Sequence, residues 1–204
     1  MGNDGLTTTT FGSRLVPAKG VAELIAYAKA NPGKLAIASA GNGTPSHVTG
    51  ELFKQTAGID MVHVPYRGMA PALTDLIAGH VQVLFASITA SLGYIRAGKL
   101  RALAVTTATR SDELPEVPPL HDVVPGFEDS IWYGLGATGG TPPAVVARLN
   151  REINAALANP TIKARLKSLG ATVMPGTPAE FAKLIVEETA KWADVVKRSG
   201  AKPD

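Results

Sequence analysis

Residues Lys34–His47 read KLAIASAGNGTPSH, and this stretch is the clearest indication of the fold class. Its first part, Lys34–Ser39, is a short apolar run of the kind that forms a strand. Two glycines then allow the chain to turn sharply, and Pro45 fits the first turn of a helix over Ser46–Ala57. A strand, a tight loop and a helix in succession are the repeating unit of an α/β fold.

The same alternation continues on both sides of this stretch. Further strands are predicted at Met61–Val64, Val81–Phe85, Arg101–Thr106 and Ile131–Leu135, and further helices at Val21–Ala30, Pro71–Ala78 and Ile88–Ala97. Strands that alternate with helices indicate a mainly parallel sheet with helices on both faces.

The last third of the chain is different in character. A proline-rich, acidic connection over 111–129 leads to three predicted helices, opened by Pro142-Pro143, by Pro160 and by Thr177. Thr177 and Glu180 have the spacing of a capping box. The last helix carries an apolar stripe from Phe181 to Val196, and such a stripe must be covered by something.

Composition excludes several classes of protein. The 204 residues carry 20 Lys+Arg against 17 Asp+Glu, and a net charge of +3 is too small and too scattered for a nucleic-acid surface. The absence of cysteine removes disulfides, thiolate nucleophiles and thiolate metal sites. No apolar run approaches the 18 residues of a membrane span. Met1–Arg14 is polar, lacks the apolar core of a signal peptide and is expected to be a flexible leader.

The loop after the first predicted strand is the best candidate for a binding site. Ligands of open α/β sheets bind at the carboxyl ends of the strands. Here two glycines bring the backbone close to a ligand, the following helix begins with unpaired N–H groups, and Ser39, Thr44 and Ser46 add hydroxyls. Those groups suit a carboxylate or phosphate. A capped structural turn without a ligand explains the same residues, and both interpretations stay open.

Two other loops fall on the same predicted edge. In the second, Tyr66 could donate a hydrogen bond or lie against a ligand, and Arg67 could pair with a carboxylate. A surface turn with a solvated arginine is the alternative. The third, Phe85-Ala86-Ser87, is of interest only because of its position.

Catalytic and metal patterns are weak. His47 and Glu51 share a helix face, but two ligands without a third make a poor zinc site. No Gly-Lys-Ser/Thr or G-x-S-x-G motif is present. His63 lies in an apolar strand and is expected to be a hydrogen-bonded core or edge residue. We therefore expect neither an enzyme nor a cofactor or metal site.

Several segments taken together resemble a known family. They read GKLAIASAGNGTPSH (33–47), ELFKQTAGIDMVHVPYRGMAPALTDLIAGHVQVLF (51–85), IRAGKLRALAVTTATRS (95–111), LPEVPPL (114–120), TPAEF (177–181) and KWADVVKRSG (191–200). This pattern is similar to the receptors of tripartite tricarboxylate transporters, also called Bug receptors, and covers the chain from about Leu15 to its end.

The resemblance implies a type II periplasmic-binding-protein-like fold, in which two α/β lobes close on a small carboxylate. It implies delivery of that ligand to a membrane permease, a periplasmic location and no nucleic-acid partner. The ligand-binding positions carried over are Ser39, Ala40, Asn42, Gly43, Thr44 and His47 in the first loop, Tyr66, Arg67 and Gly68 in the second, and Ala86 and Ser87 in the third. Family members often have Asp where this chain has Ala86, which argues against an amino-acid ligand.

The resemblance also implies a domain organisation. Relative to the family, the chain begins where the polypeptide crosses into its second lobe. We expect the leader over 1–14, a complete second lobe over 15–130, and a helical return that belongs to the first lobe over 131–204. Exposing the apolar stripe of the last helix would cost about 1.5–3 kcal/mol per side chain. The C-terminal helices are therefore predicted to pack on another copy or to fold back on the remaining lobe.

Two other classes of function stay open from the sequence. One is an effector-sensing regulatory domain, although no DNA-binding helix-turn-helix precedes the fold. The other is an enzyme that acts on a carboxylate substrate, although no acid/base pair is evident.

Overall fold

The computed structural model describes residues 6–12 and 17–199, and for residues 6–12 only the backbone. It contains a six-stranded sheet with the order β3-β2-β4-β1-β5, and β6 also pairs with β1. The strands are β1 (Leu6–Gly12), β2 (Ala36–Ser39), β3 (Val62–Pro65), β4 (Val83–Ser87), β5 (Arg101–Val105) and β6 (Ser130–Ile131). Strand β2 runs parallel to β3 and β4, whereas β1 runs antiparallel to β4, β5 and β6.

Strand β1 corrects one expectation. Leu6–Gly12 lies within the predicted flexible leader, yet it forms a strand between β4 and β5. Its sequence, LTTTTFG, is rich in threonine, and β-branched residues favour the extended backbone. Residues 1–5 and 13–14 of the expected leader lie outside the described residues.

The helices agree closely with the sequence prediction. They are α1 (Val21–Ala30), α2 (Pro45–Ala57), α3 (Met69–Ala78), α4 (Ile88–Arg96), α5 (Pro143–Ala158), α6 (Pro160–Ser168) and α7 (Pro178–Ser199), with a short 3₁₀ turn η1 (Leu120–Asp122). The predicted capping box is present, because Glu180 accepts from the Thr177 amide at 2.7 Å and the Glu180 amide donates to Thr177 Oγ1 at 3.2 Å. The predicted strand Ile131–Leu135 is wrong beyond Ile131, where the pairing with β1 ends.

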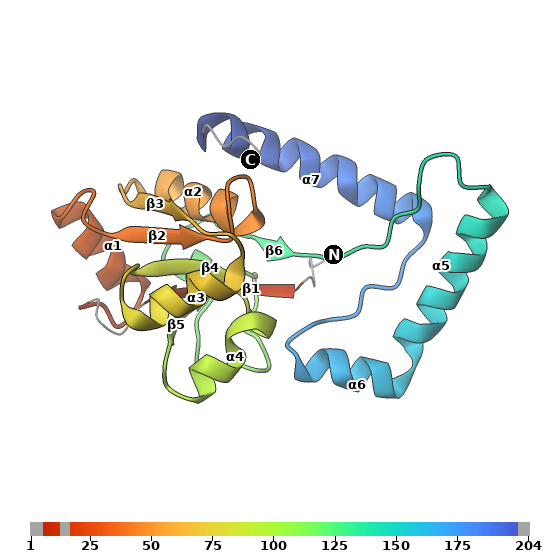
Figure 1. Cartoon of the computed structure of the whole chain (residues 1–204), viewed down its shortest axis with the longest axis horizontal. Coiled ribbons are helices and arrows are strands. Elements are labelled where there is room, and N and C mark those ends of the chain that lie inside the picture. The colour runs from red at the N-terminus through yellow and green to blue at the C-terminus, as the bar shows by residue number, and fades with distance from the viewer. Residues whose placement is uncertain (1–5, 13–16, 200–204) are drawn as a thin grey trace.

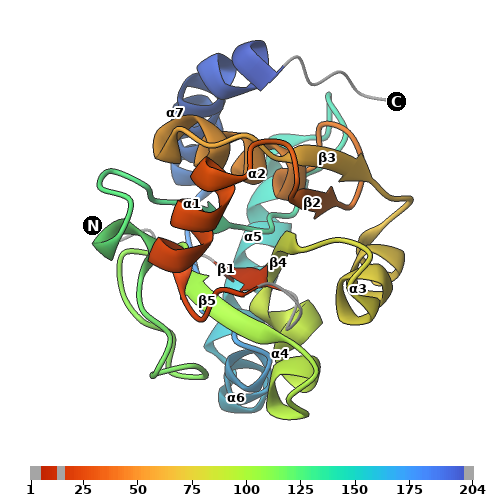
Figure 2. The same ribbon diagram turned by 90° about the vertical axis from the view of Figure 1, so that its left-hand side faces the viewer.

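Two apolar layers enclose the sheet. Strand β4 is buried throughout, and its residues alternate between the layers: Phe85 packs with Leu24 and Phe53 on the side of α1 and α2, and Leu84 packs with Leu76 on the side of α3. Figure 2 shows α1 and α2 on one side of the strands and α3 and α4 on the other. The sheet is therefore covered on both faces, as the alternation of elements predicted.

The C-terminal helices extend away from this body. Figure 1 shows α5 and α6 standing apart from the sheet and α7 crossing back over α2. Helices α5 and α6 have no buried residue, and Val195 is the buried residue of α7. The end of α7 thus folds back on the sheet domain, one of the two predicted outcomes. Other parts of this C-terminal arm (residues 132–199) stay exposed, with Leu135 at 74% and Val186, within α7, at 69%.

Candidate functional site

The parallel register places the first two predicted loops side by side. Ser39, the last residue of β2, is paired with Pro65, the last residue of β3. Two backbone hydrogen bonds then join the loops: the Tyr66 amide donates to the Ser39 carbonyl at 3.0 Å, and the Gly68 amide donates to the Ala40 carbonyl at 3.1 Å. The loops are therefore one continuous surface at the carboxyl edge of the sheet.

The third predicted loop is at the same edge but differs in exposure. Ala86 and Ser87 belong to β4 itself, and Ser87 is the N-cap residue of α4. Ala86 is fully buried beside β1 and Ser87 is 8% exposed. The backbone of β1 pairs with Ala86 and Ser87, so the predicted third loop is part of the sheet in this structure.

The first loop is held by its own side chains. Gly41 and Gly43 have φ angles of +136° and +71°, which only glycine adopts without strain. The Ala40 amide donates to Ser46 Oγ at 2.9 Å, the Gly41 amide to Ser39 Oγ at 3.2 Å, and the Gly43 amide to His47 Nδ1 at 3.1 Å.

These contacts change the anion site that was expected from the sequence. The sequence suggested unpaired amides at this bend, whereas these three amides already have side-chain acceptors. Gly43 itself is exposed, so the bend is open to solvent. A carboxylate would therefore have to exchange with a hydroxyl or imidazole acceptor rather than meet a bare amide.

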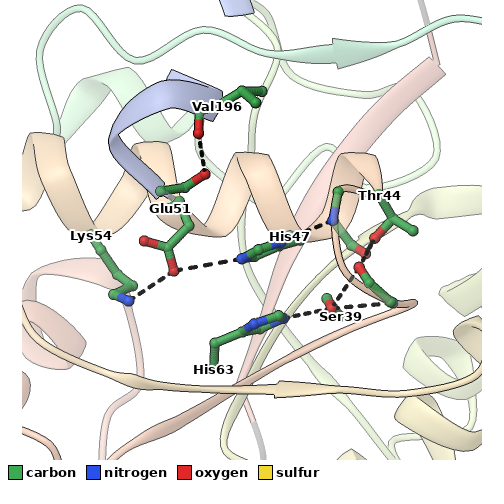
Figure 3. A network of polar contacts seen from close by, with 11 residues as sticks. Ser39, Thr44, His47, Glu51, Lys54, His63 and Val196 are labelled. Atoms are coloured by element: carbon green, nitrogen blue, oxygen red, sulfur yellow. Dashed lines mark hydrogen bonds and ion pairs between the residues drawn. The ribbon is translucent and has the colours of Figure 1, made fainter. Parts of the chain in front are cut away.

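A stacked pair of imidazoles lies under this loop (Figure 3). The rings of His47, on α2, and His63, on β3, are 3.8 Å apart and tilted by only 3°. His63 Nε2 is 2.7 Å from Ser39 Oγ, and the nearest acidic group of the network is Glu51, with Oε1 4.0 Å from His47 Nε2. Glu51 is itself bound by Lys54 at 2.8 Å.

Burial favours the neutral form of both imidazoles. Desolvation lowers the pKa of His47 below its usual 6.5, and the nearby Glu51 opposes this only in part. Desolvation, with a further contribution from His47, lowers the pKa of His63 to about 4. The expectation that His63 is a hydrogen-bonded core or edge residue is confirmed.

The second loop presents one cation. Arg67 is exposed at the carboxyl edge, available to pair with an acidic ligand. The hydroxyl of Tyr66, considered from the sequence as a donor to a ligand, instead donates to Asp75 Oδ2 on α3 at 2.7 Å. Burial and this carboxylate raise the pKa of Tyr66 to about 12. Tyr66 therefore anchors the loop to α3.

His63 and Asp75, which contact the two loops from β3 and α3, were not among the predicted site residues, whereas Ser46 was predicted as one of the hydroxyls of the first loop. Ser46 follows directly from its position in the first turn of α2. His63 could have been found from the register, because it pairs with Ile37 and its side chain therefore lies on the same face of the sheet as Ser39, two residues further along β2. Asp75 carries no local signal, because the contact joins it to Tyr66 across the loop before α3.

No metal centre or membrane span was found within residues 6–12 and 17–199. His47 and Glu51 are not joined by a third His or acidic side chain placed to share an ion there. In the same residues, no helix combines the length and apolar character needed to cross a bilayer.

Comparison with curated proteins finds clear relatives. The chain is 43% identical over 178 residues to a UPF0065 protein of the tcbD-tcbE intergenic region of Pseudomonas sp. strain P51, covering 86% of this chain and 53% of that protein. It is 38% identical over 180 residues to BugT of Bordetella pertussis, covering 88% and 55%. The chain thus spans about half the length of these relatives.

Solved structures share the fold. Rpa4515 of R. palustris with adipate superposes with a TM-score of 0.92 at 34% identity, over 98% of this chain and 68% of that one. The periplasmic binding protein BugD gives a TM-score of 0.87 at 32% identity, over 98% and 70%. MatC of Rhodopseudomonas palustris with bound malate gives 0.87 at 31% identity, over 94% and 66%. The periplasmic-binding-protein-like α/β class predicted from the sequence is confirmed.

The family model for these receptors matches nearly the whole chain. The match to the tripartite tricarboxylate transporter family receptor runs over residues 9–201. It includes both loops that meet at the carboxyl edge and the three C-terminal helices. The chain therefore belongs to the tripartite tricarboxylate transporter receptor family.

Proposed function

We propose that this chain is the ligand-binding part of a receptor that captures small organic carboxylates and delivers them to a tripartite tricarboxylate-type transporter. The observation that carries the proposal is the open bend at Gly43, which joins β2 to the N-terminus of the 13-residue helix α2. Two similar structures, with adipate and with malate, support a carboxylate as the ligand.

The chemistry of the edge fits an anion. The positive end of the α2 dipole points toward the bend, and a negative group there gains about 0.3–1 kcal/mol. Hydroxyls of Ser39, Thr44 and Ser46 surround the bend, and Thr44 Oγ1 lies 3.0 Å from Ser46 Oγ. Thr44 is the one of the three that is not buried, and its hydroxyl, which donates to the Gly41 carbonyl at 2.7 Å, can rotate to donate to a carboxylate oxygen. Arg67 then supplies a full positive charge for a second carboxylate.

The proposed ligand-binding residues are those carried over from the family. They are Ser39, Ala40, Asn42, Gly43, Thr44 and His47 with Tyr66, Arg67 and Gly68, and at the edge of β4 Ala86 and Ser87. A buried alanine at position 86 offers no counter-charge to an ammonium group. The proposal is therefore for plain carboxylates rather than amino acids.

The setting of the receptor is part of the proposal. Family membership and the similar periplasmic binding protein support capture in the periplasm and release to a membrane permease. The proposed organisation is a complete second lobe over 15–130 and, over 131–204, a helical return that belongs to the first lobe. Association through the exposed C-terminal helices is a further expectation, discussed below.

Calorimetric titration with adipate and with malate tests the proposal. The unmodified chain is expected to bind at least one of them, and the uncharged diamide of the same acid should not bind. Gly43→Leu should weaken binding at least tenfold, because a side chain at φ +71° distorts the bend.

Gly126→Leu is the matched control. Gly126 also has a positive φ, +79°, and has open space around it, but it lies far along the chain from the bend. It should suffer the same backbone strain without loss of affinity. Equal affinity of the Gly43 variant and the unmodified chain would refute the assignment of this loop.

A further inference from the structure

His63 makes two contacts with the first loop although it belongs to a different element. From β3, its Nε2 atom reaches Ser39 Oγ at 2.7 Å, and its ring lies flat against His47 at 3.8 Å. Ser39 Oγ in turn accepts from the Gly41 amide, and His47 Nδ1 accepts from the Gly43 amide. Both glycines of the bend are therefore linked to His63 through one intermediate residue each, Ser39 for Gly41 and His47 for Gly43. Figure 3 shows Ser39 and His47 beside His63.

We propose that His63 is a positioning residue for the first loop: through Ser39 and His47 it holds Gly41 and Gly43 in the conformation that receives the ligand, and it makes that conformation depend on pH. This rests on the proposed function as far as the ligand is concerned. The hold on the loop itself does not require a ligand.

The protonation state of His47 decides whether the Gly43 contact exists. An amide can only donate, so His47 Nδ1 must be unprotonated to accept from it. The ring proton of neutral His47 therefore sits on Nε2, which faces Glu51 Oε1 at 4.0 Å. A second proton would go to Nδ1 and would set two N–H groups against each other. Gly43 would then be released.

His63 influences that protonation by covering one face of the His47 ring. Water is excluded from this face, and desolvation is the main reason why both imidazoles resist protonation. The other charged groups that act on the pair also lie on α2: Glu51 favours the charged form and Lys54 opposes it. Strand β2, which pairs with β3, has only Ser39 and apolar residues over Ala36–Ser39, so it places no charged group beside the imidazoles.

Two substitutions separate the two contacts. His63→Phe keeps an aromatic cover over His47 but cannot bond to Ser39. His63→Gln keeps a polar group near Ser39 but removes the ring. His80→Gln is the matched control, because His80 is an exposed histidine outside this network. Each protein is followed without ligand by NMR, through the ring signals of His47 and the amide signals of Gly41 and Gly43 as pH falls from 8 to 4.5.

In His63→Gln, the midpoint of the His47 titration should rise by about 0.5–1 pH unit toward its usual value, and the Gly43 amide should move with it. In His63→Phe, that midpoint should stay as low as in the unmodified chain, while the Gly41 amide shifts at every pH. His80→Gln should change neither. Identical His47 midpoints and identical Gly41 and Gly43 signals in all four proteins would overturn the proposal.

Binding of adipate and malate is measured in parallel. Because protonation of the ligand affects every protein equally, the ratio of each variant's Kd to that of the unmodified chain is the readout. His63→Phe should raise this ratio about fivefold at pH 7.5, the loss of one hydrogen bond. His63→Gln should stay within about threefold at pH 7.5 and weaken further by pH 6, because Gly43 is released earlier. Ratios that are flat with pH and equal to that of His80→Gln would contradict the proposal.

Ser39→Ala provides a second route should a His63 variant fail to fold. It removes the hydrogen bond to His63 from the other side, together with the acceptor of the Gly41 amide, and leaves the ring stack in place. It should shift the Gly41 amide at least as far as His63→Phe does, with no change in the His47 midpoint. The two proposals fail separately: absence of binding by the unmodified chain refutes the carboxylate receptor, whereas the ligand-free spectra alone decide whether His63 holds the loop.

Discussion

Asp129 is a carboxylate buried where the chain leaves the sheet domain. It is 3% exposed and accepts a hydrogen bond from Thr49 Oγ1 of α2 at 2.6 Å. Burial raises its pKa above the usual value, while the Thr49 bond and Lys191 of α7 act in the opposite direction. Asp129 thus joins the segment before β6 to α2, and its ionised form is poorly solvated.

We expect Asp129→Asn to remove a pH dependence of stability. With a raised pKa, the folded state keeps its proton when the unfolded state has lost it, so stability falls as pH rises from about 4 to the folded-state pKa. The amide oxygen of Asn can still accept from Thr49, and no charge is buried. The variant should be as stable as the unmodified chain at pH 7, or more so.

Urea unfolding at several pH values between 4.5 and 8 tests this prediction. The difference between the two proteins isolates Asp129, because every other titratable group is the same in both. Thr49→Val serves as the companion variant, since it removes the hydrogen bond and leaves the charge, and it should destabilise by about 1–3 kcal/mol at pH 7. An Asn variant with the unmodified pH slope would show that the charge is solvated after all.

At the scale of elements, α2 lies unusually close to the sheet. A Cβ atom on Gly50 would be 2.7 Å from Ile37 Cδ1 of β2, and Ile37 is buried. Gly93, in the middle of α4, has open space at the corresponding position. The close approach brings the first turn of α2 down onto the end of β2, where the bend lies.

These two glycines provide a matched pair of substitutions. Gly93→Ala should stabilise the protein by about 0.5–1 kcal/mol, the usual gain of alanine over glycine inside a helix. Gly50→Ala should gain less than this or destabilise, because Ile37 must move inside a packed core. Chemical denaturation of both variants provides the measurement. An equal gain in stability at the two positions would show that a Cβ atom fits between α2 and Ile37.

The elements themselves were largely predictable because their signals are local. Helix α1 begins and ends where its pattern predicted, and the Thr177–Glu180 capping box formed as expected. Strand β1 was missed because a run of threonines is polar in composition but extended in backbone preference. Its place between β4 and β5 depends on partners more than 70 residues away in the sequence.

At the scale of the whole molecule, the C-terminal arm leaves apolar side chains in water. Tyr133, Leu135 and Val186 are 77%, 74% and 69% exposed. Val195, near the end of α7, is the buried residue of that helix, and α7 packs on α2. Phe181 packs edge-on against Trp132, so the first turn of α7 is held against the segment that follows β6.

We therefore expect the chain to associate through the arm. Light scattering on eluted fractions should give a mass above that of one 21.1 kDa chain, increasing with concentration. Replacing Leu135 and Val186 together with lysine should restore the monomer mass. Val123→Lys, a partly exposed apolar residue beside η1, is the control and should not. A monomer at all concentrations, before any substitution, would contradict this expectation.

The α/β class, the helix positions and the two loops of the candidate site could be predicted from the sequence, because periodicity, capping and glycine turns act over a few residues. The contacts that hold those loops depend on tertiary packing. The parallel register of β2 and β3 brought His63 to Ser39 and joined the two loops, and the packing of α3 drew the Tyr66 hydroxyl to Asp75. Contacts of this kind form between residues distant in sequence, so their geometry exists only once the sheet has assembled.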